Sequence, residues 1–212
     1  MEAFILPPVS QGVRSVVLGG LSLAERAVLA LHRGGINRVL VQRTCGITEA
    51  SVARLARHGV VVTRVGDTPL SSVAPGEGAI ILSADVVFEP SAVGALVEQI
   101  RARGWSGAAA TDPAPGTFVA LTPSAVDALR AAPEQGVLEA VGALRVCGLG
   151  ALFCRVLSKA GDAQAIQRQY MLHRYGPERP FLRVMRAFST RATTAFLRLW
   201  PEDEIGAHPL TR

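Results

Sequence analysis

Short apolar runs alternate with helix-type segments along the first two-thirds of the chain, and this rhythm restricts the fold more than any other feature. The apolar runs predict strands at residues 4–6, 15–18, 38–42, 60–65, 79–82, 108–111 and 117–121. Apolar residues recur at helical spacing at residues 21–33, 48–58, 90–103 and 124–131. Helices that alternate with buried strands cover both faces of a parallel sheet. We therefore predict an α/β, Rossmann-like, three-layer fold with a mainly parallel sheet.

Several helix ends carry recognisable signals. Ser22 and Glu25 have the spacing of a capping box, and Gly34 follows the end of that helix. Thr48 is placed to cap the next helix. These signals predict where two of the helices begin, independently of the apolar pattern.

The composition favours a folded protein in a reducing compartment. Of its 212 residues, 49% are hydrophobic, which is enough for one large domain with an appendage. The cysteines Cys45, Cys147 and Cys154 show no metal-ligand spacing, so we expect reduced core thiols. The N-terminus does not resemble a signal peptide, and no apolar stretch is long enough to span a bilayer. We expect a cytoplasmic protein, with a peripheral position at the inner face of the membrane as a further option.

Two groups of residues are candidates for chemistry. Asp85 follows the apolar run 79–82, and α/β sheets place ligands at the ends of such strands. A carboxylate there can hold Mg²⁺ with the phosphates of a nucleotide, although a turn-capping aspartate is the alternative. Gly12, Gly19 and Gly20 would allow backbone N–H groups to approach phosphate, but glycines of plain turns remain the alternative.

Three segments, in order, resemble the sugar-phosphate nucleotidyltransferases. They are VLGGLSLAERAVLALHRGGINRVLV at residues 17–41, IILSADVVFEP at residues 80–90 and GTFVALTPS at residues 116–124. The resemblance covers residues 1–160 and implies the nucleotide-diphospho-sugar transferase-like (GT-A) fold. It also implies that Asp85 is the metal-binding aspartate and that Mg²⁺ is the cofactor. Gly12 and Arg14 are the residues that could stand in for the family's phosphate loop, and together with Gly19 and Gly20 they are the expected nucleotide contacts.

The remaining residues, 161–212, are predicted to form a helical, basic, amphipathic tail, with one helix at residues 164–175 and a second at residues 181–200. Between residues 155 and 200 there are nine Lys or Arg residues and two acidic ones. The segments GDAQAIQRQY at residues 161–170 and RVMRAFSTRATTAFL at residues 183–197 resemble a junction in bifunctional proteins of inositol-phospholipid synthesis. In those proteins a cytidylyltransferase domain precedes a membrane-embedded CDP-alcohol phosphatidyltransferase. The phosphatidyltransferase's own signature is absent from this chain.

The chain departs from the nucleotidyltransferase pattern in its first loop. The family's glycine-rich loop carries an Arg and a Lys, whereas this loop begins with Pro7 and Pro8, and the only lysine is Lys159. Proline removes N–H donors from a loop that should supply them. The family's second metal-binding aspartate is also missing, because Val-Leu-Ser stands at residues 156–158. Losing one such charge-stabilising group lowers a rate by about 10²–10³-fold.

Two functions follow. The first is a degenerate, weakly active or inactive domain that binds nucleotide and phosphate or associates with a membrane partner. The second is an active Mg²⁺-dependent cytidylyltransferase that makes a CDP-polyol from CTP and a polyol phosphate, with catalytic residues that the sequence does not identify. The basic tail indicates an anionic membrane surface, a membrane-embedded phosphatidyltransferase, or a second copy in a homodimer. We expect no nucleic acid as partner, because no recognition motif or stacking pattern is present.

Overall fold

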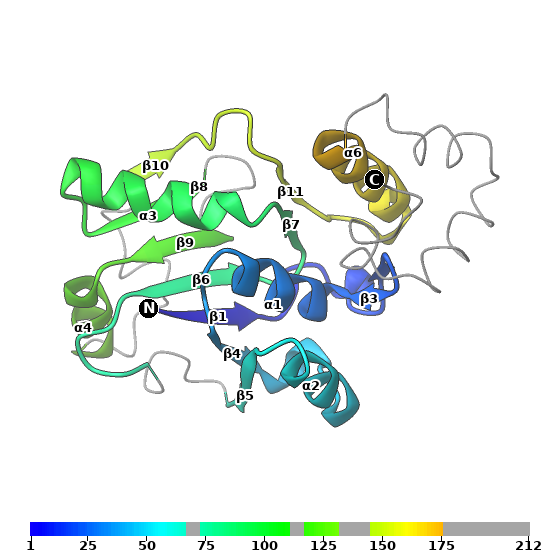
Figure 1. Ribbon diagram of the computed structural model, residues 1–212, viewed down its shortest axis with the longest axis horizontal. Helices are drawn as coiled ribbons and strands as arrows, with labels where there is room; N and C mark the ends of the chain where they lie inside the picture. Colours follow the sequence, from blue (N-terminus) through cyan, green and yellow to red (C-terminus); the bar gives the residue numbers. More distant parts are fainter. Residues whose placement is uncertain (67–72, 111–116, 132–144, 176–212) are drawn as a thin grey trace.

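The computed structural model describes residues 1–66, 73–110, 117–131 and 145–175. Within them a seven-stranded sheet forms the centre of the molecule, with strand order β10-β8-β9-β6-β1-β4-β5 (Figure 1). Its strands are β1 (Glu2–Leu6), β4 (Arg38–Gln42), β5 (Val61–Val65), β6 (Ala79–Ser83), β8 (Gly107–Ala110), β9 (Phe118–Leu121) and β10 (Arg145–Cys147). Only β9 runs antiparallel to its neighbours, so the predicted mainly parallel sheet is confirmed.

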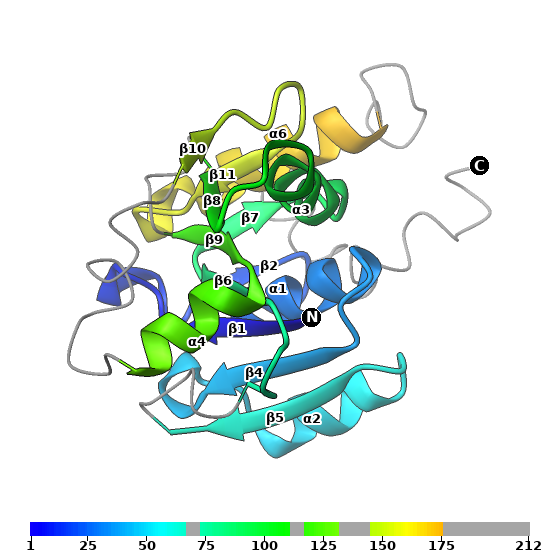
Figure 2. The ribbon, with the colours of Figure 1, turned by 90° about the vertical axis from the view of Figure 1, so that its left-hand side faces the viewer.

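Helices cover both faces of the sheet, as Figure 2 shows. They are α1 (Leu23–Arg33), α2 (Glu49–Ala56), α3 (Ser91–Arg103) and α4 (Pro123–Ala131). The alternation of side chains along each strand explains the two cores. In β1, Ala3 and Ile5 join α1, α2 and α3 in one cluster, whereas Phe4 faces the cluster that includes α4. The three-layer prediction is therefore confirmed.

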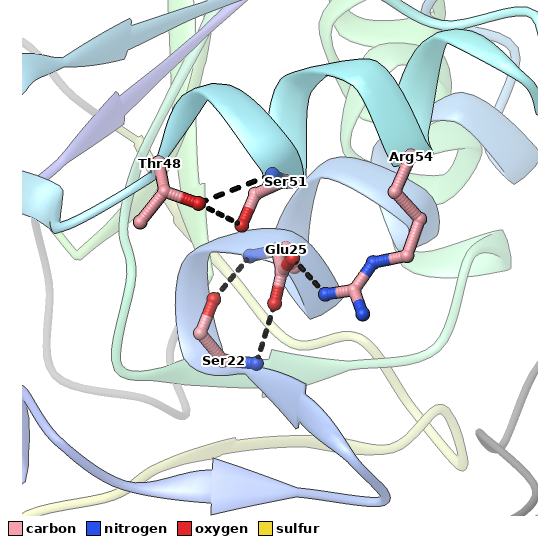
Figure 3. Close-up of polar contacts among 5 residues, drawn as sticks. All are labelled: Ser22, Glu25, Thr48, Ser51 and Arg54. Atoms are coloured by element: carbon pink, nitrogen blue, oxygen red, sulfur yellow. Dashed lines mark hydrogen bonds and ion pairs between the residues drawn. The ribbon is translucent and has the colours of Figure 1, made fainter.

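The predicted helix signals are present as side-chain contacts. Ser22 caps α1 by accepting a hydrogen bond from the Glu25 N–H at 3.3 Å, and Glu25 Oε2 accepts one from the Ser22 N–H at 2.9 Å (Figure 3). Thr48 Oγ1 accepts from the Ser51 N–H at 3.1 Å and caps α2. Both caps satisfy N–H groups that the first turn of a helix leaves unpaired.

A smaller unit packs against one end of the sheet. It contains the hairpin β2 (Val17–Leu18) and β3 (Leu21–Ser22), the antiparallel pair β7 (Val86–Phe88) and β11 (Cys154–Val156), and the helix α6 (Ala163–Tyr175). Leu18, Val87, Leu157, Ile166 and Met171 are among the buried residues of its core. The sequence did not predict β7, β10 or β11, because runs of three residues carry too little periodicity to be recognised.

Helix α6 confirms the helix expected at residues 164–175. The second expected tail helix, residues 181–200, lies outside the described residues. The division into residues 1–160 and 161–212 therefore stays a prediction. In the part of the chain that the structure describes, no helix is long and apolar enough to cross a membrane.

Candidate functional site

The carboxyl ends of β1 and β6 lie side by side at one edge of the sheet, because Leu6 pairs with Ser83. The loop that follows β1 continues along the end of β6. The Ala84 N–H donates to the Leu6 carbonyl at 2.9 Å, and the Ser83 hydroxyl donates to the Pro7 carbonyl at 3.0 Å. Ligand sites of α/β proteins lie at this edge. We therefore take the loop after β1 and the turn after β6 as the candidate site.

Asp85 lies where the two segments meet. Its Oδ2 atom accepts a hydrogen bond from the Val9 N–H at 3.0 Å, and its carbonyl accepts one from the Leu157 N–H at 2.8 Å. The residue is 1% exposed. Its Oδ1 atom is buried and has no hydrogen-bond partner among the described residues. A buried carboxylate oxygen without a partner is unfavourable, so this atom is a natural contact for a cation or for a donor group of a ligand.

The donor set at Asp85 fits one mode of Mg²⁺ binding. Mg²⁺ is usually held by one or two carboxylates together with water and substrate phosphates. Among the described residues, no group of three or more His, Cys, Asp or Glu side chains lies close enough to hold a metal ion. The site therefore fits Mg²⁺ that arrives with phosphates, and it does not fit a metal cage made of protein alone. Because Asp85 is 1% exposed, a ligand can reach its carboxylate only after the surrounding segments move.

Gly12 and Arg14 lie in the same first loop, in and directly after the short helix η1 (Gln11–Val13). Gly12 is exposed, and a Cβ built on it would meet only Ser10 Oγ, at 3.8 Å. Nothing in the backbone there requires glycine. Arg14 is also exposed, and its charge acts on Cys45, at the end of η2 (Arg43–Cys45) after β4. Arg14 therefore adds positive charge close to the candidate edge.

Cys45 is not a nucleophile at neutral pH. Burial raises the pKa of its thiol to about 12, and the Gln42 backbone and Arg14 oppose that shift without cancelling it. The thiol donates to the Ile5 carbonyl at 3.4 Å. Cys147 and Cys154 are buried, and none of the three cysteines forms a disulfide. The prediction of reduced thiols as small packing residues is confirmed.

Gly19 and Gly20 belong to a different part of the molecule. They form the turn of the β2–β3 hairpin, with φ of 61° and 82°. A two-residue hairpin turn with both φ angles positive favours glycine strongly. The Gly19 N–H donates to Gln167 Oε1 on α6 at 3.1 Å. The two glycines line a cavity beside α6, and Asp85 is not among its lining residues.

Comparison with known proteins identifies the fold. No protein-family model and no curated protein matches the chain. UTP-bound UGPase from Acinetobacter baumannii superposes with a TM-score of 0.57 at 10% identity, covering 89% of this chain and 99% of its own. Inositol-1-phosphate CTP transferase from T. maritima gives 0.52 at 12% identity, covering 80% and 96%. The 4-diphosphocytidyl-2C-methyl-D-erythritol synthase of Anaerococcus prevotii gives 0.54 at 9%, covering 81% and 98%.

The fold is the nucleotide-diphospho-sugar transferase-like fold. Within this nucleotidyltransferase-like fold, the predicted site residues fall into two groups. Gly12, Arg14 and Asp85 belong to the two segments at the sheet edge, whereas Gly19 and Gly20 lie against α6. The sequence missed Gln167, because a glutamine within a helical segment carries no signal of a contact 148 positions away.

Proposed function

We propose that this chain is a nucleotidyltransferase-like domain that binds a nucleotide with Mg²⁺ at Asp85 and transfers nucleotidyl groups weakly or not at all. The observation that carries the proposal is the unpartnered Oδ1 atom of Asp85, buried at the carboxyl end of β6 in a nucleotidyltransferase-like fold. Bound Mg²⁺ would neutralise the charge of the nucleotide's phosphates.

The first loop supports the proposed weakness of catalysis. Pro7 and Pro8 have no N–H group, and the next backbone donor, the Val9 N–H, is occupied by Asp85. The start of the loop therefore holds the carboxylate, and its first three residues offer no N–H group to a triphosphate. Arg14 is the basic residue of this segment, and no lysine precedes Lys159. The negative charge that develops at the α-phosphate during transfer would therefore meet few preorganised donors or cations.

Nucleotide binding can be measured separately from transfer. We expect CTP or UTP with Mg²⁺ to raise the melting temperature, by roughly 5–10 °C at a hundred times the dissociation constant. Chelation of Mg²⁺ with EDTA should remove that shift. Asp85→Asn should also remove it, while Asp127→Asn, which removes the same charge from an exposed position on α4, should not. Equal shifts for wild type and Asp85→Asn would refute the proposal.

The alternative is an active cytidylyltransferase. Its support is the likeness of the fold to inositol-1-phosphate CTP transferase and to a 4-diphosphocytidyl-2C-methyl-D-erythritol synthase. It predicts Mg²⁺-dependent release of pyrophosphate from CTP with a polyol phosphate, and loss of that release in Asp85→Asn. Our proposal predicts nucleotide binding with little or no pyrophosphate release. A turnover that matches an ordinary nucleotidyltransferase would favour the alternative.

We also propose a peripheral membrane role for the basic tail. Its support is the excess of Lys and Arg between residues 155 and 200, since each basic residue near an anionic surface contributes about 1 kcal/mol of attraction. The full chain should sediment with vesicles that contain phosphatidylserine and not with phosphatidylcholine vesicles. Truncation after residue 175 should abolish this binding. Equal binding of the truncated chain would leave the membrane-embedded phosphatidyltransferase and the homodimer as the partners to test.

A further inference from the structure

A cavity of 380 Å³ lies between the β2–β3 hairpin and the start of α6. Figure 1 shows this hairpin and α6 next to each other at one end of the molecule. The cavity's walls include Gly19 and Gly20 from the hairpin, Gly161 from the short helix η4 (Ala160–Asp162), and Gln164 and Gln167 from α6. Pockets that hold small organic ligands have volumes of about 300–1,000 Å³. This cavity is therefore large enough for a small ligand.

Gln167 carries the strongest indication of a ligand. Its side chain lines the cavity and is 9% exposed. Because Oε1 accepts the hydrogen bond from the Gly19 N–H, the other amide atom must be the donor Nε2. Nε2 is buried and has no hydrogen-bond partner among the described residues. Buried donors are almost always paired, so a ligand with a hydrogen-bond acceptor would complete this site.

The surroundings of Gln167 favour an acceptor that carries negative charge. The cavity lies against the first turn of α6, a helix of 13 residues whose N-terminal end carries partial positive charge. The Ala163 N–H at that end is bonded to the Ala160 carbonyl, so the helix contributes its partial charge and Gln167 contributes the unpartnered donor. Three glycines, Gly19, Gly20 and Gly161, expose their backbone there without side chains. None of the residues that line the cavity is charged. Among the lining residues an oxyanion therefore meets the Gln167 amide and no carboxylate, and Asp162, which follows Gly161 in the chain, is exposed and does not line the cavity.

We propose that this cavity binds a small phosphomonoester, with the phosphate held by Gln167 Nε2 beside the start of α6. The cavity exceeds the size of a phosphate group, so the remaining volume accommodates a short organic body. Asp85 does not line the cavity, and the proposal therefore goes beyond the nucleotide site at the sheet edge.

The test uses the full chain with glycerol 3-phosphate as the probe, in EDTA so that the Asp85 site is not loaded with Mg²⁺. Saturable binding is measured by calorimetry and by the rise in melting temperature, against glycerol with matched sodium chloride. Gln167→Glu keeps an oxygen for the Gly19 N–H and replaces the unpartnered donor with a second carboxylate oxygen. Gln169→Glu adds the same charge at an exposed position of the same helix.

Wild type and Gln169→Glu should bind the probe equally, and Gln167→Glu should bind at least about tenfold more weakly, the effect of losing one hydrogen bond to a charged group. If Gln167→Glu does not fold, Gln164→Glu supplies the charge from an exposed residue on the cavity wall. The proposal would be overturned if wild type showed no saturable binding up to about 10 mM glycerol 3-phosphate. It would also be overturned if Gln167→Glu and Gln164→Glu both bound the probe as tightly as wild type. Asp85→Asn should leave this binding unchanged, so failure here is distinct from failure of the nucleotide proposal.

Discussion

Glu25 is buried at the junction of α1 and α2, and its substitution tests how the two helices are joined (Figure 3). One carboxylate oxygen accepts from the Ser22 N–H at 2.9 Å, and the other pairs with the Arg54 guanidinium. The side chain of Glu25 is 4% exposed, whereas that of Arg54 is 40% exposed. The carboxylate therefore satisfies two donors from different segments, and it has little access to water.

Glu25→Gln should cost about 2 kcal/mol of unfolding free energy. A glutamine has one acceptor oxygen, so it can serve Ser22 or Arg54 but not both. A hydrogen bond to a charged group contributes about 1.5–3 kcal/mol, and the loss is limited here because Arg54 can turn toward water. Two kcal/mol corresponds to a fall of roughly 4–8 °C in melting temperature for a chain of this size.

The cost should depend on pH. Burial raises the pKa of Glu25, but hydrogen bonds from Ser22, Ser51 and Arg54 outweigh it and hold the pKa below the ordinary value of 4.5. A carboxyl group with a lowered folded-state pKa stabilises the fold fully above its unfolded pKa, and this stabilisation is lost as the pH falls through the folded value. The difference between wild type and Glu25→Gln should therefore be largest near pH 7 and shrink below about pH 4.5.

Urea unfolding of both proteins from pH 7 to pH 3.5 measures this difference. The matched control is Glu49→Gln, which breaks the surface pair with Arg64. Glu49 is 86% exposed, so its loss should cost less than about 1 kcal/mol at every pH. A Glu25→Gln cost that is independent of pH, or no larger than that of the control, would refute the reasoning.

Three further predictions concern packing, charge and reactivity. A Cβ on Gly34 would lie 2.9 Å from a backbone oxygen, so Gly34→Ala should lower the unfolding free energy by about 1–3 kcal/mol. A Cβ on Gly94, within α3, would have no atom within 4 Å, so Gly94→Ala should raise the unfolding free energy. Thermal melts measure both changes. Arg38→Met removes the partner of the buried Glu2 carboxylate and should cost about 3 kcal/mol in urea unfolding, and a cost below about 1 kcal/mol would contradict this. The Cys45 thiol should react slowly with iodoacetamide up to about pH 10, because its pKa is about 12, and a fast reaction at pH 8 would contradict this.

The sequence was sufficient for the elements whose signals are local. The strand at residues 38–42 has the predicted bounds, and Ser22 with Glu25 forms the predicted capping box. Such features depend on residues within four positions of each other, so a pattern in the sequence contains them. The pair β7–β11 joins Val86 to Val156 across 70 positions. Neither three-residue strand carries a sequence pattern that predicts this pairing.

The candidate sites show the same limit at the level of side chains. Position alone singled out Asp85, because an aspartate directly after a buried strand stands at the ligand edge of an α/β sheet. The structure adds that Asp85 is 1% exposed and that its carboxylate accepts a hydrogen bond from the Val9 N–H of the loop after β1. The sequence contained no signal for either feature. Gly19 and Gly20 had the composition of a phosphate loop, yet their positive φ angles belong to a hairpin turn. The hairpin's neighbour is α6, so any phosphate these glycines contact lies beside Gln167 and away from the carboxylate. A nucleotide at the sheet edge and a phosphomonoester beside α6 are therefore separable by substitution, although the sequence placed all these residues in one site.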